Sequence, residues 1–336
     1  MSIQHNLEKI PFDYYDINGY ILAVSGPVKG AFHEEFSHFK CSKKKAMLYI
    51  IETSEKDLPL KQRGSDEGVD LPFGGGNVVK YEKGISSGWV VFLIMHFITW
   101  KDKTFLHCGA VAKDGKALIF PATGDVGKTK TTMYLVSKGY EYLSDEWLVI
   151  GDNGVAYPFL RKTKVFDYNL KSDRTLAKRI LGPKRFFYDL IYKTLKLIPK
   201  IFHHRYIQFA CGRITPFFQR RVDEIFPNAK YAKPSKIEKV FWLVKDESAK
   251  EIRLENTTPK EIAERMYYAI FLEKFMFYFN YLLYAYPSGP NKEWDNYFLE
   301  NKRIMQKAFQ KAKVIKKVIV PDEFDVKEME KVVSSV

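Results

Sequence analysis

Short apolar runs separated by turn residues predict a mixed α/β protein. In the N-terminal quarter, three runs at 20–24, 46–51 and 77–81 are rich in β-branched and aromatic residues and predict strands. The turn cluster LPFGGGN at 71–77 precedes the third run. Residues 1–85 are therefore expected to form a small β-rich N-terminal portion.

Helix-like and strand-like patterns alternate along residues 86–336. The apolar run at 88–100 is too short to span a bilayer, which needs about 20 residues, so we expect a buried helix there. The aromatic-rich run at 266–286 is broken by polar residues and is likewise expected to form buried helices. No stable membrane insertion is expected. Further strands are predicted at 239–245 and 314–320, and a helix start at Thr258-Pro259.

The most informative stretch lies at 105–147. A strand at 117–120 enters a turn-rich loop at 121–127, and a helix follows. Such a unit directs backbone N–H groups and a helix N-terminus toward one anion. The pattern GxxxxGK[ST] fits at Gly127 and the two residues after it, but Ala122 replaces the first glycine. We predict a nucleotide phosphate site, with Gly124 and Gly127 as flexible positions. The alternative is an ordinary strand-to-helix loop.

A second strand, predicted at 140–150, carries the adjacent acidic residues Asp145 and Glu146. Magnesium-dependent phosphoryl transfer needs an oxygen ligand for the metal and a base for the acceptor hydroxyl. Two carboxylates beside a phosphate loop meet both needs. The alternative is a solvated acidic pair at a strand end.

The run from 106 to 146 resembles the HPr kinase/phosphorylase superfamily, whose P-loop kinases are related in fold to ATP-dependent phosphoenolpyruvate carboxykinase. Its members place a histidine about twenty residues before the loop lysine, and a helix ending in glycine and an acidic doublet after it. The matching residues here are His107, Gly127, Lys128, Thr129, Gly139, Asp145 and Glu146.

The resemblance implies an α/β fold with three parts. These are an HPr-kinase/PEP-carboxykinase-like P-loop core within 86–336, the β-rich portion at 1–85, and a basic, largely helical insertion at about 165–221.

The resemblance also implies ATP and Mg²⁺ as cofactors. Lys128 would neutralise the transferred phosphoryl group, and His107 would steady its oxygens. Asp145 would act as the base, while Thr129 and Glu146 would hold the metal; the roles of the two acidic residues can be exchanged. The implied nucleotide-binding residues are Thr123, Gly124, Asp125, Val126, Gly127, Lys128, Thr129 and Lys130.

One loop residue departs from the family. Asp125 places a carboxylate where relatives have glycine, and it repels a polyphosphate unless Mg²⁺ or a lysine compensates. ATP is therefore the expected donor, with another nucleotide as the alternative.

Positive charge is concentrated in one segment. The chain has 336 residues and a net charge of +14, and residues 161–221 carry sixteen lysines and arginines against three aspartates. Because aromatic residues are interleaved with these cations, the segment suits RNA, whose loops expose both phosphates and bases. The candidate RNA-binding residues are Lys178, Arg179, Lys184, Arg185, Lys193, Arg205, Arg213, Arg220 and Arg221.

Two other interpretations of this segment remain open. Residues 184–202 could form an amphipathic helix on an anionic membrane. Alternatively, the aromatics are core and the lysines form a solvated face.

The basic segment also helps to identify the acceptor of the phosphoryl group. The sequence is similar in general character to archaeal RNA kinases that phosphorylate a ribose 2′-hydroxyl of tRNA, which implies RNA, and specifically tRNA, as partner. The alternatives are a protein-serine or small-molecule kinase of the HPr kinase type, and a non-enzymatic nucleotide-gated binder. Because relatives often form oligomers, the resemblance is also compatible with a homo-oligomer.

The cysteines and the first residues favour a cytoplasmic location. Cys41, Cys108 and Cys211 are widely spaced and odd in number, so neither a disulfide framework nor a zinc site is predicted. The start MSIQHNLEK lacks the pattern of a secretory signal.

Overall fold

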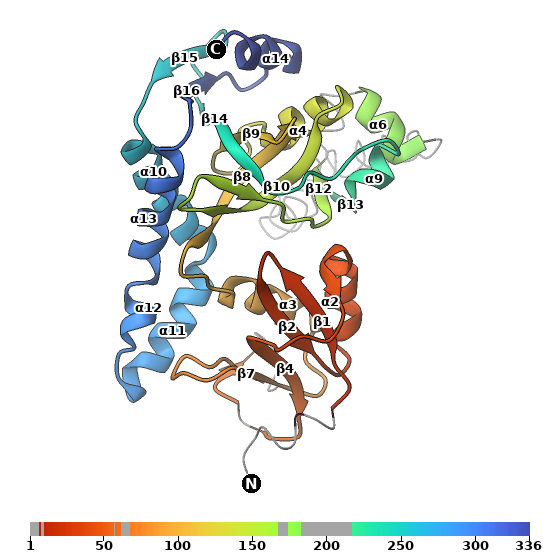
Figure 1. Ribbon diagram of the computed structural model, residues 1–336, viewed down its shortest axis with the longest axis vertical. Helices are drawn as coiled ribbons and strands as arrows, with labels where there is room; N and C mark the ends of the chain where they lie inside the picture. Colours follow the sequence, from red (N-terminus) through yellow and green to blue (C-terminus); the bar gives the residue numbers. More distant parts are fainter. Residues whose placement is uncertain (1–6, 8–9, 57, 62–67, 167–173, 183–216) are drawn as a thin grey trace, which may run out of the picture.

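The computed structural model is an α/β protein built on two large sheets (Figure 1). The described strands form two seven-stranded sheets and one two-stranded sheet, which confirms the general α/β class. Among the described residues, no helix is both long and apolar enough to cross a bilayer. The structure describes Leu7 and residues 10–56, 58–61, 68–166, 174–182 and 217–336.

The N-terminal sheet is mixed, with the order β3-β1-β2-β4-β7-β6-β5. The strands predicted at 20–24, 46–51 and 77–81 are confirmed as β2, β4 and β7. The apolar run at 88–100 forms the buried helix α3, as predicted. The elements are β1 (Asp13–Ile17), β2 (Tyr20–Val24), α2 (Lys29–Phe36), a 3₁₀ turn (Ser37–Phe39), β3 (Lys40–Cys41), β4 (Leu48–Thr53), β5 (Leu60–Lys61), β6 (Gly68–Asp70), β7 (Val78–Glu82) and α3 (Ser87–Phe97).

The second sheet has the order β11-β10-β8-β9-β14-β16-β15. The β8–β9 hairpin turns at Asp114 and Gly115, whose φ angles of 53° and 72° suit a two-residue hairpin turn. Strand β14 runs parallel to both β9 and β16, so the carboxyl ends of these three strands meet at one edge. The strands are β8 (Lys103–Lys113), β9 (Lys116–Pro121), β10 (Glu141–Gly151), β11 (Val155–Tyr157), β14 (Ser235–Lys245), β15 (Arg253–Asn256) and β16 (Val314–Val320).

Helices cover this second sheet. Helix α4 (Lys128–Ser137) follows the loop after β9 and packs against β8 and β10. Helix α10 begins as predicted, because the Thr258 hydroxyl accepts a hydrogen bond from the N–H of Glu261 at 3.1 Å. The other helices are α6 (Arg174–Leu181), α9 (Val222–Ile225), α10 (Pro259–Glu273), α11 (Phe275–Ser288), α12 (Lys292–Asp295), α13 (Tyr297–Phe309) and α14 (Val326–Ser334).

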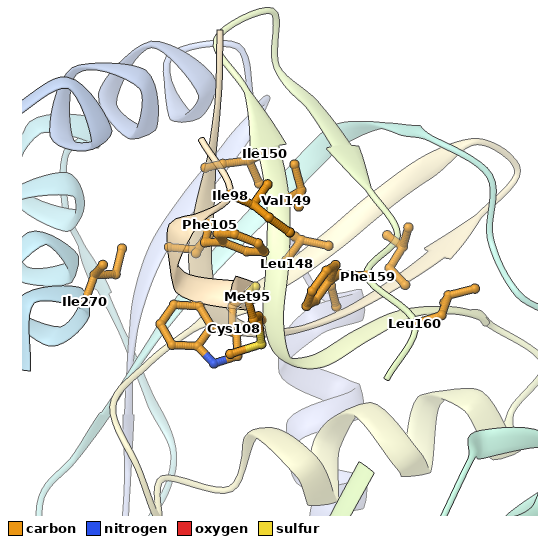
Figure 2. Packing of buried hydrophobic residues seen from close by; sticks show 14 of the residues in the cluster. Met95, Ile98, Phe105, Cys108, Leu148, Val149, Ile150, Phe159, Leu160 and Ile270 are labelled. Carbon is orange, nitrogen blue, oxygen red and sulfur yellow. The ribbon is translucent and has the colours of Figure 1, made fainter. Parts of the chain in front are cut away.

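The two sheets share one hydrophobic core. Figure 2 shows the part of this core around Phe105, Leu148 and Phe159. The ring of Phe105 on β8 lies 5.0 Å from that of Phe159, and Phe159 lies 5.8 Å from Phe36 of α2. An ion pair of 2.9 Å between Arg161 and Glu35 lies beside this contact. The segment after β11 is thus fixed to the N-terminal sheet by both apolar and ionic contacts.

The aromatic-rich run at 266–286 forms helices as predicted, but its expected burial is wrong for one face. Phe277 and Tyr281 of α11 are buried against Phe73 of the N-terminal portion. Phe275 and Phe279 are exposed. A sequence with apolar residues on every helix face does not reveal which face packs on the protein.

The basic segment is entered and left through a pair of neighbouring strands. β12 (Thr163–Phe166) and β13 (Phe217–Arg220) are antiparallel, with Phe166 opposite Phe217. The chain therefore departs and returns at one place, close to Arg161. Residues 167–173 and 183–216 lie outside the described residues, and so does the helix predicted at 184–202.

Candidate functional site

The loop between β9 and α4 contains two residues in the left-handed backbone conformation. Asp125 and Gly127 have φ angles of 56° and 91°, whereas Ala122 and Gly124 do not have positive φ. Aspartate tolerates the left-handed conformation better than most residues, which accounts for its presence at this position. Ala122 is buried and adopts no unfavourable φ angle, so the missing glycine causes no backbone strain.

Only one of the two glycines predicted to be flexible uses that freedom. A Cβ on Gly127 would lie 2.7 Å from the ring of Phe324, whereas a Cβ on Gly124 would meet nothing within 4 Å. Phe324 belongs to the segment between β16 and α14. The C-terminal part of the chain therefore covers the end of the loop.

Lys128 is buried at the start of α4, and its Nζ donates a hydrogen bond to the carbonyl of Thr123. Burial is the main cause that lowers the pKa of this ammonium, and the nearby Asp145 carboxylate opposes that shift. The lysine thus bends back over its own loop. A phosphate oxygen in the loop would replace a neutral carbonyl with a charged partner, which forms a stronger hydrogen bond.

Asp145 lies beside Lys128 and is 7% exposed. Burial raises its pKa to about 7, although Thr129 and Lys128 both act to lower it. Its Oδ1 atom has no hydrogen-bond partner among the described residues. A buried oxygen in this state is costly, and such groups concentrate at functional sites.

Glu146 differs from Asp145 in its surroundings. It has an unusual φ of 154° and lies half-exposed, 3.6 Å from Arg161. Both carboxylates line a small pocket with room for about one water molecule. In the described part of the chain, no group of three acidic, histidine or cysteine side chains could hold a metal alone. A magnesium ion here would need phosphate oxygens as further ligands, which is its usual mode of binding.

His107 supports the beginning of the loop between β9 and α4. Its Nδ1 lies 2.9 Å from the carbonyl oxygen of Ala122, so this nitrogen must carry a proton and donate it. The ring is buried and lies 5.3 Å from that of Trp147. This contact places His107 against the loop backbone, and its role in steadying phosphoryl oxygens stays a prediction.

Two residues in the first turn of α4 also interact with other parts of the protein. The Thr129 hydroxyl acts on Asp145, as its effect on the pKa of that carboxyl indicates. Lys130 donates a 2.5 Å hydrogen bond to the carbonyl of Phe324 and lies 4.8 Å above its ring. Lys130 therefore binds the C-terminal segment in this structure.

The candidate RNA-binding residues that are described fall into two kinds. Arg179 donates to the carbonyl of Ile225 and lies over Phe226, and Arg221 pairs with Asp223 and Glu224, so both contribute to the fold. Two others, Lys178 and Arg220, are exposed. The other five candidates, Lys184, Arg185, Lys193, Arg205 and Arg213, lie outside the described residues.

Sequence reasoning did not assign three residues that the structure brings to the site: Gly109, Arg161 and Phe324. A lone glycine within a strand often marks a close backbone approach, and that signal was present at Gly109. Arg161 is near Glu146 only because β10 and the segment after β11 come together in space. No local pattern indicated Phe324.

Comparison of the sequence with protein-family models and with curated proteins finds no match.

Proposed function

We propose that the chain is an ATP- and Mg²⁺-dependent kinase that transfers the γ-phosphoryl group to a hydroxyl. The observation that carries this proposal is the state of Asp145. A buried carboxyl with a raised pKa and an unpartnered oxygen stands beside the lysine of a phosphate-type loop. A base with a pKa near the working pH is the most efficient one for removing a proton from a hydroxyl.

The loop can hold the phosphates of the donor. The backbone N–H groups of residues 123–128 and the N-terminus of α4 form the cradle, and Lys128 neutralises charge on the γ-phosphoryl group. Two of these residues, Asp125 and Gly127, are left-handed, and turns with such residues can direct successive N–H groups toward one anion. His107 holds Ala122 in place through the Nδ1 contact.

In the transfer step, Asp145 takes the proton of the acceptor hydroxyl as its oxygen attacks the γ-phosphorus. The bond between the γ-phosphorus and the bridging oxygen breaks, and the nucleoside diphosphate leaves. Thr129 and Glu146 would hold Mg²⁺, which supplies charge neutralisation between the phosphates. Since Asp145 is buried next to Lys128 and Glu146 is half-exposed beside Arg161, their environments favour Asp145 as the base.

The acceptor that the chain supports best is RNA, specifically a ribose 2′-hydroxyl of tRNA. The segment at 161–221 has a net charge of +13, which favours a polyanion. It leaves and rejoins the core at the β12–β13 pair. Arg161, two residues before this pair, contacts Glu146 of the candidate site. The place where the basic segment leaves the core thus lies next to the candidate site.

A protein-serine or small-molecule acceptor is the second candidate. It is favoured by the contacts of Arg179 and Arg221, which show that part of the positive charge serves the fold. Offering labelled ATP with bulk tRNA, a mixed protein extract and free serine side by side separates the two. Label in tRNA supports the RNA acceptor, and label only in protein or serine overturns it.

A second experiment tests the basic segment directly. Replacing Lys184, Arg185 and Arg205 by alanine should weaken RNA binding and flatten its salt dependence by about 0.7 in slope for each lost phosphate contact. The matched control replaces three exposed lysines outside the segment, Lys43, Lys45 and Lys250. An unchanged slope in the first variant would contradict the assignment.

A further inference from the structure

One helix face of the protein is both exposed and apolar. Eight of the twelve large apolar side chains that are exposed in the described part of the chain lie between 268 and 286. Their exposed fractions run from 43% to 95%. We call this set the apolar seam: Tyr268, Leu272, Phe275, Met276, Phe279, Leu282, Leu283 and Tyr286.

Six members of the apolar seam follow a strict heptad spacing. Positions 268, 272, 275, 279, 282 and 286 are separated alternately by four and three residues. This 3.5-residue period is the pattern by which one α-helix packs along another. A helix lying on a lipid surface needs only a broad apolar face and no such strict period.

The apolar seam runs along helices α10 and α11, which are almost one continuous helix. Only Lys274 separates them, and the hydrogen bonds from Lys274 N–H to Ile270 and from Tyr278 N–H to Lys274 carry the helical pattern across it. The opposite face is already used, because Met266, Phe277 and Tyr281 are buried in the protein. The apolar seam is therefore a second packing face on a helix already anchored by the first.

The area is sufficient for a stable interface. With aromatic side chains of about 150–250 Å² each, the apolar seam exposes on the order of 900 Å². The largest patch on a typical monomer is about 300–600 Å², and a standard interface uses about 800 Å² per partner.

The charges near the apolar seam argue against an anionic membrane. Between 266 and 288 the charged residues are Glu273 and Lys274, and Lys274 is buried with its Nζ donating to the Tyr297 hydroxyl at 2.5 Å. Lys274 is thus not available on this face for lipid headgroups. A groove at the α10 end carries both signs of charge, as a self-complementary contact needs; it is lined by Glu261, Glu264, Arg265, Tyr267, Tyr268, Leu299 and Lys302.

We propose that the apolar seam binds the same seam of a second copy of this chain, giving a two-fold symmetric dimer through paired α10–α11 helices. In such an interface each copy presents the same surface, so the acidic and basic groups of one groove can meet their opposites in the other. Heptad side chains of one copy then fill the spaces between those of its partner.

The test is sedimentation velocity on the full-length chain from about 1 to about 100 µM, where mass action reveals a dimer. Two matched variants decide the interface. Leu282→Glu places a charge in the apolar seam at a side chain that is 45% exposed, and Met47→Glu places one outside it at a side chain that is 49% exposed. Leu272→Glu repeats the seam change, and circular dichroism checks that all variants fold.

We expect the wild type and Met47→Glu to dimerise equally. Each seam variant should raise the dimer dissociation constant at least about 30-fold. A wild type that is monomeric throughout the range would overturn the proposal. A dimer whose dissociation constant is unchanged by both seam substitutions would also overturn it. So would a monomeric chain that floats with neutral phosphatidylcholine vesicles and loses this binding in the seam variants.

Discussion

Gly109 of β8 lies directly opposite Asp145 of β10 in the antiparallel pairing of these two strands in the second sheet. A Cβ on Gly109 would lie 2.3 Å from the Thr132 hydroxyl and 3.5 Å from the Cβ of Lys128. The absence of a side chain at this position therefore lets the first turns of α4 lie against the strand. It brings Lys128 close enough to Asp145 for each to influence the pKa of the other.

Gly109→Ala should push α4 away from β8. We expect a loss of about 1–3 kcal/mol in the free energy of unfolding, as for other additions to a close-packed core, and weaker nucleotide binding. The double variant Gly109→Ala/Thr132→Ala should recover part of the lost stability and part of the lost nucleotide binding. It removes the Thr132 hydroxyl, which is the atom nearest to the added methyl group. Chemical denaturation and nucleotide titration measure the two effects. A single variant that binds nucleotide like the wild type would contradict the role assigned to Gly109.

The two loop glycines should respond differently to the same substitution. Gly127→Ala forces a side chain into a φ of 91° and against Phe324, so we expect about 1–3 kcal/mol of destabilisation. Gly124→Ala meets nothing within 4 Å and should change the free energy of unfolding by less than about 0.5 kcal/mol. Thermal unfolding of the pair tests this. Equal effects would count against the observed loop conformation.

Asp145 should make stability depend on pH in a defined direction. Its folded pKa of about 7 lies above the unfolded value of about 3.9. Between these values the folded chain holds a proton that the unfolded chain has lost, so the contribution to stability falls as pH rises toward 7. The Asp145→Asn variant does not have this loss of stability. The difference between its melting temperature and that of the wild type should therefore increase from pH 5 to pH 8.

The matched control for that series is Asp114→Asn, in the exposed hairpin turn. This substitution makes the same change from carboxyl to amide at a side chain that is exposed in the folded chain. A difference in melting temperature between Asp145→Asn and wild type that does not change with pH would refute the raised pKa of Asp145.

Arg161 should couple the N-terminal sheet to the candidate site. Its 2.9 Å ion pair with Glu35 is mostly buried. A double-mutant cycle with Arg161→Met and Glu35→Gln should therefore give a coupling energy of about 1–3 kcal/mol. The neighbouring pair Lys162–Glu34 has an exposed carboxylate and should give less than about 0.5 kcal/mol. A larger coupling energy for Lys162–Glu34 than for Arg161–Glu35 would show that Arg161 does not hold the segment after β11 against the N-terminal sheet.

The elements of the core were predictable because each carries a local signal. The strands at 117–120, 140–150, 239–245 and 314–320 are confirmed as β9, β10, β14 and β16. The helix start at Thr258-Pro259 is also confirmed. Hydrophobic periodicity and helix-capping residues are properties of neighbouring positions, so a single sequence contains them.

What the sequence did not contain are the contacts between distant segments. Phe324 reaches Gly127 across almost two hundred residues, and Arg161 reaches Glu35 across more than a hundred. The exposed face of α11 was missed for a related reason. Its apolar residues surround the helix, and only the tertiary structure decides which of them the protein buries.

The most direct test of the kinase proposal is transfer of the γ-phosphoryl group from labelled ATP, measured alongside nucleotide binding. The proteins to compare are the wild type, Lys128→Ala, Asp145→Asn and the control Lys138→Ala at the exposed end of α4. The proposal predicts transfer by wild type and Lys138→Ala, its loss in Lys128→Ala and Asp145→Asn, and retained nucleotide binding in Asp145→Asn. Full transfer by a folded Asp145→Asn variant would contradict the proposal. It would also be contradicted if the wild type binds ATP and Mg²⁺ but transfers no phosphoryl group in the presence of tRNA, protein and serine.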